Sequence, residues 1–541
     1  MAQIQIRDDA GAPIPRANIR ISEGTKPSDE AIFDVFTDLA GNTGWPIPHF
    51  PVIDYTLHIN DQNVLPEFGH VEHFVPGVSI HTAQDIRIVL PRTSAPPVEP
   101  PAPPIDPPIP GDGPRGTVRT SGRMMLDDRG PRNFLSTTLM WANWGYREDR
   151  DRLKQNFAYL QSLGLDGIRP LGSVMGDSWA GRQTDPTWPD YEDVIAGQID
   201  LAWTYGLRQF PFTMLGDHFT DVHKATDRMI SALRGREEKI GYLEIANEWG
   251  HAVEISEADL MTIAKKVRAA FPNMLLALSR PKAGGADVMK ALMKQIGGPL
   301  VFPRHTERKE NDRNWRQVRQ SYDFQDDDWT ASQQEPPGPA SSVGELWKPR
   351  QHGCMRWLAH AAGCGIHCHH TGAGVRGRHS AATSSVSERH ANLFEVPGFV
   401  EQIAALKMIE RFLPEGVQNW NVENNGRDKL HPLQLPEAVG DGGGFWAGDD
   451  DVELGDVNKN YAVLGPDGRF MVGIFGLNGE TNEPPLSERR AGQALYPMVI
   501  EAFDSLTGES IEKGDVDTGE WITLPGRRDR EMSYIVMGQR R

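Results

Sequence analysis

Two glutamates lie four positions apart in one apolar stretch, Ile240–His251, which reads IGYLEIANEWGH. The stretch begins like a buried strand and stops at Trp249–Gly250. Side chains at even spacing share one face of a strand, so Glu244 and Glu248 are expected to point the same way. A carboxylate at the end of a buried strand costs free energy unless it has a partner or a task. The stretch is therefore a candidate catalytic site, and the alternative is a strand that ends in a solvated Asn-Glu turn.

The segment Glu244–Glu248, EIANE, resembles the E-x-x-N-E signature of clan A glycoside hydrolases, the cellulase- and mannanase-type barrels. In that family the signature ends the fourth barrel strand, which implies that Asn247 binds substrate and that Glu248 is the general acid/base. Retaining glycosidases need a second carboxylate as nucleophile, roughly 5–5.5 Å away. The family takes it from the end of strand seven, and here the predicted seventh strand ends in Glu335. Glu345, ten residues farther along, remains the alternative nucleophile.

Two further site residues follow from the same resemblance. Gly164–Pro170 is similar to the G-x-(D/N)-x-(I/V)-R segment of the family, whose arginine, here Arg169, keeps the nucleophile ionised. A neighbouring cation lowers the pKa of a carboxyl group, which suits a nucleophile. A structural ion pair between Arg169 and Glu244 is the other interpretation. His305, at the end of the predicted sixth strand, has the position of a polar orienting residue.

Aromatic side chains are expected near the site because carbohydrate rings stack on them. Six tryptophans fall on or near predicted strand-to-helix loops, although each is as readily a core residue: Trp141, Trp144, Trp179, Trp188, Trp249 and Trp347. We predict substrate contacts for Trp141, Trp144, Trp249 and His370. Two features depart from the family. Trp249 stands where proline usually follows Asn-Glu, and the predicted eighth strand offers His367–His370 where the family has a tryptophan.

Strands and amphipathic helices alternate from about residue 116 to 414. The predicted strands are Phe134–Trp141, Leu165–Leu171, Arg208–Leu215, the opening stretch, Met274–Leu278, Leu300–His305, Trp329–Glu335 and Gly365–Thr371. Apolar residues at helical spacing follow each strand, and Ser256 with Asp259 forms a capping pattern at one helix start. Eight such units in about 300 residues are typical of a (β/α)₈ TIM barrel, whose active site lies at the carboxyl ends of the strands. A doubly wound sheet would need fewer units and a glycine fingerprint.

The remaining chain is predicted to form two β-rich modules and a linker. Residues 1–92 alternate like short strands and are similar to carboxypeptidase-regulatory-like β-sandwiches, which implies a spacer, anchor or binding module. Half of the residues from Ala95 to Pro114 are proline, so 93–115 is an extended spacer, with an SH3-type ligand as the lesser alternative. Residues 415–541 resemble the small β-sandwich that often follows a clan A barrel. Gly465–Gly468 predicts a hairpin turn there.

Composition narrows the class of partner and cofactor. The 541-residue chain has a net charge of −18 and a pI near 5.4, which argues against nucleic acid or an anionic membrane surface. No apolar run approaches the roughly 20 residues that span a bilayer. The three cysteines, Cys354, Cys364 and Cys368, lie among histidines but match no zinc template. The run Asp449–Asp451 fails the spacing of a calcium loop. We therefore expect no metal and no cofactor.

Together these features predict a retaining glycoside hydrolase that cleaves a β-linked poly- or oligosaccharide through Glu248 and Glu335. The alternative is a non-catalytic carbohydrate-binding or adhesion protein on a barrel scaffold, such as a component of a phage particle. The N-terminus, MAQIQIRDDAG, shows no secretory leader. We accordingly expect synthesis in the cytoplasm, with release by lysis or carriage on a phage particle, where an active depolymerase would also fit. The first module would then anchor the chain to another protein or a particle.

Overall fold

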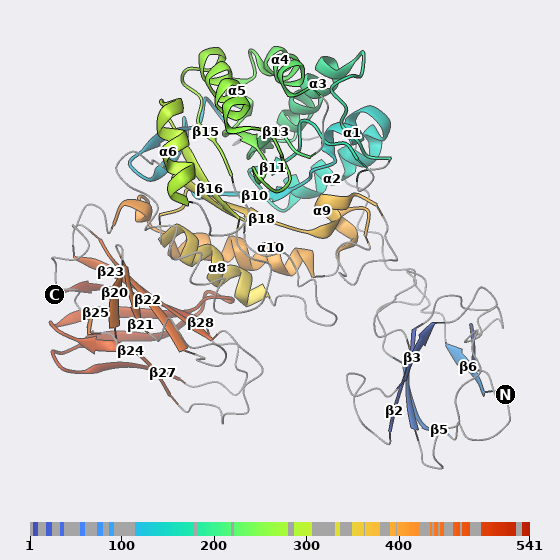
Figure 1. Cartoon of the computed structure of the whole chain (residues 1–541). Coiled ribbons are helices and arrows are strands. Elements are labelled where there is room, and N and C mark those ends of the chain that lie inside the picture. Colours follow the sequence, from blue (N-terminus) through green and yellow to red (C-terminus); the bar gives the residue numbers. More distant parts are fainter. Residues whose placement is uncertain are drawn as a thin grey trace. The chain divides into compact units, whose positions relative to one another are not determined.

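The computed structural model divides the chain into two compact units, Met1–Pro103 and Pro104–Arg541, and the division falls inside the proline-rich stretch (Figure 1). The residues that the structure describes are 4–8, 18–23, 33–36, 55–59, 73–78, 86–90, 114–176, 179, 181–217, 221–279, 286–305, 331–335, 349–361, 363–378, 390–396, 398–420, 433–434, 438–441, 444–447, 458–465, 468–476, 488–525 and 533–541.

The first unit consists of short strands, as its alternating pattern predicts. They are β1 (Ile4–Asp8), β2 (Asn18–Glu23), β3 (Phe33–Phe36), β4 (Tyr55–Ile59), β5 (His73–Val78) and β6 (Ile86–Leu90). Strands β1 and β6 pair in parallel, whereas β3, β2, β4 and β5 form an antiparallel sheet in that order. The resemblance to a carboxypeptidase-regulatory-like sandwich stays a prediction.

The second unit contains the predicted cycle of parallel strands. They are β10 (Phe134–Thr138), β11 (Gly167–Arg169), β12 (Arg208–Gln209) continued by β13 (Phe212–Leu215), β14 (Leu243–Ala246), β15 (Leu276–Ala277), β16 (Val301–His305), β17 (Ala331–Glu335) and β18 (Ile366–His369). One sheet has the order β12-β11-β10-β18-β17-β16 and the other β13-β14-β15. Single parallel bridges, Leu171 to Thr213, Gln209 to Ile240 and Leu276 to Leu300, join the two sheets. The eight strand positions therefore follow one another cyclically, although the ladder is not one continuous closed sheet.

Helices surround these strands (Figure 1). They are α1 (Ala142–Glu148), α2 (Arg150–Ser162), α3 (Tyr191–Thr204), α4 (Val222–Leu233), α5 (Glu257–Ala270), α6 (Ala286–Ile296), α8 (Pro349–Ala361), α9 (Gly372–Arg376) and α10 (Phe399–Met408), which continues as the 3₁₀ helix η7 (Ile409–Phe412). The capping pattern at Ser256 is confirmed, because its hydroxyl oxygen accepts the Asp259 N–H at 3.1 Å. The helix predicted at 313–320 lies outside the described residues.

A small antiparallel sheet, which the sequence analysis missed, covers the amino-terminal end of the barrel. Its strands are β7 (Arg119–Ser121), β8 (Met124–Asp127) and β9 (Gly130–Pro131). Met125 is buried in one apolar cluster with residues that begin barrel strands, among them Phe134 and Ile366. Asp127 of β8 and Arg208 of β12 form a buried ion pair at 2.6 Å. Substrate access to the barrel is therefore left to the opposite end.

The carboxyl-terminal residues form two further sheets in the same unit. The larger has the strand order β20 (Ala438–Asp441), β21 (Gly444–Ala447), β22 (Asn458–Leu464), β23 (Arg469–Gly476), β28 (Ser533–Arg540), β25 (Met498–Asp504) and β26 (Ser510–Val516). The smaller is β19 (Leu433–Gln434), β24 (Glu488–Ala494) and β27 (Trp521–Pro525). The hairpin predicted at Gly465–Gly468 joins β22 to β23.

Side chains of both sheets share one apolar cluster. The outer face of the larger sheet contributes Val463, Met471 and Ile535 to a second cluster with Trp357 of α8 and Phe412 of η7. This second cluster joins the sheet to the barrel helices. Among the described residues, no helix is long and apolar enough to cross a membrane.

Candidate functional site

The ends of three neighbouring strands build the turn that carries Asn247 and Glu248. Strand β14 ends at Ala246, between β13 and β15. The Asn247 N–H donates to the Leu215 carbonyl oxygen of β13 at 2.8 Å. On the other side, the Glu248 N–H donates to the hydroxyl oxygen of Ser279, just after β15, at 2.9 Å. The predicted fourth strand thus presents its two candidate residues at its carboxyl end, where barrel enzymes place their chemistry.

Glu248 has an unusual backbone conformation. Its φ is 47°, and it is the one non-glycine residue with positive φ among the residues that the structure describes. Left-handed backbone at a residue with a Cβ costs on the order of 1 kcal/mol, and such residues gather at active sites because the surrounding structure has to hold them. The residue is half-buried. Its carboxyl group therefore leaves the strand at an angle that a regular strand continuation would not give.

A buried polar network lies beneath this turn. The Arg169 guanidinium donates to Glu244 at 2.9 Å and to the side-chain oxygen of Asn247 at 2.8 Å. The Thr213 hydroxyl donates to the same Glu244 oxygen at 2.5 Å. Arg169 is 1% exposed and Glu244 is fully buried, so each charge relies on the other in a medium of low polarity. The structural ion pair between Arg169 and Glu244, one of the two interpretations of the sequence, is therefore present.

The same network orients the Asn247 amide. Because guanidinium groups only donate hydrogen bonds, the side-chain atom that Arg169 contacts has to be the amide oxygen. The amide nitrogen then points the other way and donates weakly to the Gly216 carbonyl at 3.5 Å. Asn247 is half-buried, so its NH₂ group is the part available to a ligand hydroxyl.

Strands β16 and β17 bring the other predicted residues to the same end of the barrel. His305 is the last residue of β16 and Glu335 the last of β17, and the two are direct neighbours in the parallel register. Their backbones are described, whereas their side chains, together with Glu345 and Trp347, lie outside the described part of the chain. The roles of Glu335 and His305 and the choice between Glu335 and Glu345 stay predictions.

Of the three tryptophans predicted to contact substrate, one is buried in the core and two are partly exposed. Trp141 is fully buried, its indole N–H donates to the Ala373 carbonyl at 3.1 Å, and the Arg152 guanidinium covers its ring at 4.3 Å. It is therefore a core residue rather than the predicted sugar platform, because no ring face is open to a ligand. Trp144 and Trp249 are half-buried. The Trp249 indole N–H donates to the Ile255 carbonyl at 2.9 Å, which fixes its ring beside the Glu248 turn.

His370 follows β18 and is 3% exposed. Four other histidines, His352 and His360 of α8 and His367 and His369 of β18, form a fully buried cluster. The rings of His352 and His369 meet edge-on at 4.9 Å, and His369 contacts the Gln402 oxygen at 3.2 Å. Burial lowers the pKa of His360 to about 3 and that of His369 to about 4, so both are neutral.

No group of three or more His, Cys, Asp or Glu side chains that could hold a metal occurs among the described residues. The thiols of Cys364 and Cys368 are buried within the core. The expectation of a metal-free mechanism stays a prediction.

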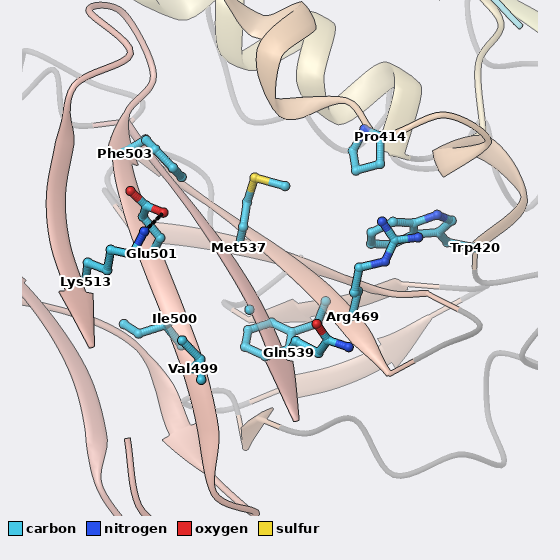
Figure 2. A pocket seen from close by; sticks show the side chains of 12 residues that line it. Pro414, Trp420, Arg469, Val499, Ile500, Glu501, Phe503, Lys513, Met537 and Gln539 are labelled. Carbon is cyan, nitrogen blue, oxygen red and sulfur yellow. Dashed lines mark hydrogen bonds and ion pairs between the residues drawn. The ribbon is translucent and has the colours of Figure 1, made fainter. Parts of the chain in front are cut away.

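A separate pocket of about 340 Å³ lies on the outer face of the larger carboxyl-terminal sheet, beside the chain that leaves the barrel (Figure 2). Trp420 and Arg469 form one wall, and Glu501 and Lys513 the opposite one. It contains none of the predicted site residues. Its lining includes a single carboxylate, Glu501, which is paired with Lys513 at 2.9 Å. We therefore place the candidate chemistry at the strand ends rather than in this pocket, because acid–base chemistry on a glycosidic bond needs two carboxyl groups.

No protein-family model matches the chain, and no curated protein matches its sequence. Solved structures do match. A protein described as "Glycoside hydrolase" is 14% identical with a TM-score of 0.51, and the match covers 79% of this chain and 97% of that one. A glycoside hydrolase family 5 protein from Bacteroides vulgatus ATCC 8482 is also 14% identical, with a TM-score of 0.49, over 79% of this chain and 93% of that one. The first likeness shows that this chain shares the fold of that protein.

Proposed function

We propose that the protein is a retaining glycoside hydrolase that cleaves a β-linked poly- or oligosaccharide, with Glu248 as general acid/base and Glu335 as nucleophile. One observation carries the proposal: Glu248 leaves the carboxyl end of β14 in a left-handed turn, next to an Asn247 amide that Arg169 orients. The fold shared with a protein described as a glycoside hydrolase supports the reaction class.

The geometry supports different roles for Glu244 and Glu248. Glu244 is fully buried and accepts hydrogen bonds from Arg169 and Thr213, so it has neither access to substrate nor a proton to give. Glu248 is half-buried at the strand end. An acid/base has to reach the glycosidic oxygen in the first step and the attacking water molecule in the second, and this position allows both. Glu244 instead serves the site by holding Arg169.

The proposed reaction proceeds in two displacements. In the first, the Glu335 carboxylate attacks the anomeric carbon while the bond from that carbon to the glycosidic oxygen breaks, and the Glu248 carboxylic acid donates its proton to the departing oxygen. In the second, the Glu248 carboxylate takes a proton from a water molecule, the water oxygen bonds to the anomeric carbon, and the Glu335 carboxylate leaves. Configuration is inverted twice and hence retained.

Asn247 and Arg169 have supporting roles in this scheme. The Asn247 NH₂ group would donate to the hydroxyl group next to the anomeric carbon, and its contact with Arg169 fixes the direction of that donation. Hydrogen bonds to this hydroxyl group strengthen in the transition state of glycoside hydrolysis. Arg169 acts through Asn247 and Glu244, since both contacts are direct.

A panel of polysaccharides tests the function. Wild-type protein should release reducing ends from at least one β-linked glycan, and the Glu248→Gln variant should not. Proton NMR of the first product should show the β-anomer before mutarotation. Binding of a glycan without release of reducing ends would instead identify a carbohydrate-binding or adhesion protein. An inverted product would exclude the double-displacement scheme.

A further inference from the structure

Ser279 makes three hydrogen bonds to the turn that carries Glu248, although it belongs to the next strand position. Its hydroxyl oxygen accepts the Glu248 N–H at 2.9 Å, and its hydroxyl hydrogen is donated to the Ala246 carbonyl at 3.2 Å. Its own carbonyl oxygen accepts the Trp249 N–H at 2.9 Å. Ser279 is 1% exposed, so water does not compete for these bonds.

These bonds act where the backbone conformation is unfavourable. Glu248 has positive φ, a conformation that a residue with a Cβ leaves readily unless neighbouring groups prevent it. On the β13 side, the Leu215 carbonyl holds only the preceding residue, through the Asn247 N–H. On the β15 side, Ser279 holds Glu248 itself. The Glu248 carbonyl oxygen also accepts the N–H groups of His251 and Ala252, at 2.9 and 3.1 Å, but these bonds lie within the turn. The Ser279 hydroxyl is the side chain that ties the Glu248 backbone to the neighbouring strand.

The two bonds of this hydroxyl also depend on each other. A hydroxyl group that donates to the Ala246 carbonyl has its lone pairs turned away from that carbonyl, and one of them faces the Glu248 N–H. Alanine at position 279 would remove both bonds and leave the partly buried Glu248 N–H group without this acceptor. Threonine keeps the hydroxyl group and adds one methyl group.

We propose that Ser279 is a positioning residue for the general acid/base Glu248, which rests on the proposed function. It touches no substrate and acts by holding the backbone of Glu248 in the left-handed turn. Its loss therefore affects the step in which Glu248 donates a proton more than any other property of the enzyme. The test is to compare substrates that need this proton with substrates that do not.

The probes are two aryl β-glycosides of the sugar that the polysaccharide panel identifies, one with a dinitrophenol leaving group and one with unsubstituted phenol. For the phenyl glycoside, Ser279→Ala should lower kcat/KM by roughly 10- to 100-fold, the size of effect that a small misplacement of a catalytic group causes. For the dinitrophenyl glycoside, the loss should be less than about threefold, because that leaving group departs without protonation. The alkaline limb of the pH profile, which reports the acid, should move as well.

Ser136→Ala is the matched control. Ser136 is another fully buried strand serine, and its hydroxyl donates to the Phe210 carbonyl at 3.0 Å, without contact to the Glu248 turn. It should lose comparable thermal stability and show no difference between the two leaving groups. Ser279→Thr should recover most of the activity on the phenyl glycoside. Should the alanine variant not fold, Ser279→Cys, which keeps a weak acceptor, is tested in the same way.

The outcomes separate the two proposals. A leaving-group-dependent loss in Ser279→Ala, restored by threonine and absent from Ser136→Ala, supports the positioning role. Equal losses on both glycosides, or none, would overturn it while Glu248→Ala still discriminates between leaving groups. If Glu248→Ala itself fails to discriminate, the acid/base assignment falls, and the role of Ser279 falls with it.

Discussion

Glu244 and Glu248 lie four residues apart at one strand, yet their surroundings differ. Glu244 is enclosed by Arg169 and Thr213, and its charge is part of the core. Glu248 stands at the end of the strand in a left-handed turn and is half-buried. Even spacing put both on one face, but the change of backbone conformation at Glu248 separates them. A carboxyl group enclosed in the core and one at the strand end thus come from a single strand.

Variants of the two proposed catalytic residues should fail in different ways. Glu335→Gln removes the nucleophile, so the loss should be on the order of 10⁵-fold, or about 7 kcal/mol of barrier, on every substrate. Glu248→Ala removes a proton donor, a contribution of typically 10²–10⁴-fold that shrinks for activated leaving groups. Azide should then restore turnover of Glu248→Ala and give a glycosyl azide of retained configuration, measured by NMR.

For a truncated Glu335, azide would attack from the side of the missing nucleophile and give the inverted product. Glu345→Gln is the comparison variant. If it is inactive while Glu335→Gln keeps its activity, the nucleophile lies ten residues farther along the chain.

Arg169 offers a test that separates stability from catalysis. Arg169→Met leaves the Glu244 carboxylate buried without its cation, which should lower the free energy of unfolding by about 3–5 kcal/mol. The double variant Arg169→Met/Glu244→Gln removes the uncompensated charge and should recover much of that loss in urea denaturation. Its kcat/KM should nevertheless stay low, because Asn247 still lacks the donor that orients its amide. Full recovery of kcat/KM in the double variant would exclude an orienting role for Arg169.

At the scale of elements, apolar runs located the barrel strands to within a few residues. Met274–Leu278 was predicted and β15 spans Leu276–Ala277, because a buried parallel strand reads as an uninterrupted apolar segment. The start of α5 was also predicted correctly, from its capping pattern. Strands β7 to β9 were missed because segments of two to four residues carry no period.

Candidate site residues could be predicted from the sequence only where the residue type is costly to bury. A glutamate at a strand end and an arginine in a strand are costly to bury, so Glu248 and Arg169 stand out. Trp141 did not follow the prediction, because an indole suits a core and a sugar platform equally and only packing decides. Nothing in the sequence marks Ser279 as a positioning residue, since serine is common at strand ends and its partners are backbone groups of another strand.

The buried histidines of α8 and β18 predict how stability depends on pH. Burial lowers the pKa of His360 to about 3 and of His369 to about 4, and it holds those of His352 and His367 well below the ordinary 6.5. The unfolded chain therefore binds more protons below pH 6.5. The free energy of unfolding should have its full value above that pH. It should decrease as the pH falls toward the pKa values of the folded state, by about 1.4 kcal/mol per pH unit for each histidine.

Urea denaturation between pH 7.5 and 4.5 measures this dependence. In His360→Gln, the amide can still donate to the Cys364 carbonyl. This variant should reduce the slope of the free energy of unfolding against pH by the amount that corresponds to about one bound proton. His223→Gln is the control, because His223 is 46% exposed on α4 and lies apart from the cluster. A pH-independent free energy of unfolding would show that the histidines are not buried as neutral groups.

At the scale of the whole molecule, the carboxyl-terminal residues belong to the same compact unit as the barrel, and Met1–Pro103 is a unit by itself. The carboxyl-terminal sheet shares an apolar cluster with the barrel helices, in which Trp357 and Phe412 meet Met471 and Ile535. The first unit, Met1–Pro103, is compact by itself, and the chain between the two units is rich in proline. The larger carboxyl-terminal sheet thus packs on the barrel helices, whereas we propose that the first unit serves as an anchor or binding module.

Two truncations test this difference. A protease should cut between Ala95 and Pro114 and release an N-terminal fragment of about 10 kDa, because a proline-rich stretch buries little and is accessible. A protein that starts near residue 116 should keep the melting temperature and kcat/KM of the full chain. A protein that ends at Pro414 should instead aggregate or melt far lower, since it exposes the side chains of α8 and η7 that the sheet covers. Calorimetry and kinetics on both truncated proteins measure these outcomes. A lower melting temperature in the protein that starts near residue 116 would mean that the first unit packs on the barrel, and the anchoring role would then be wrong.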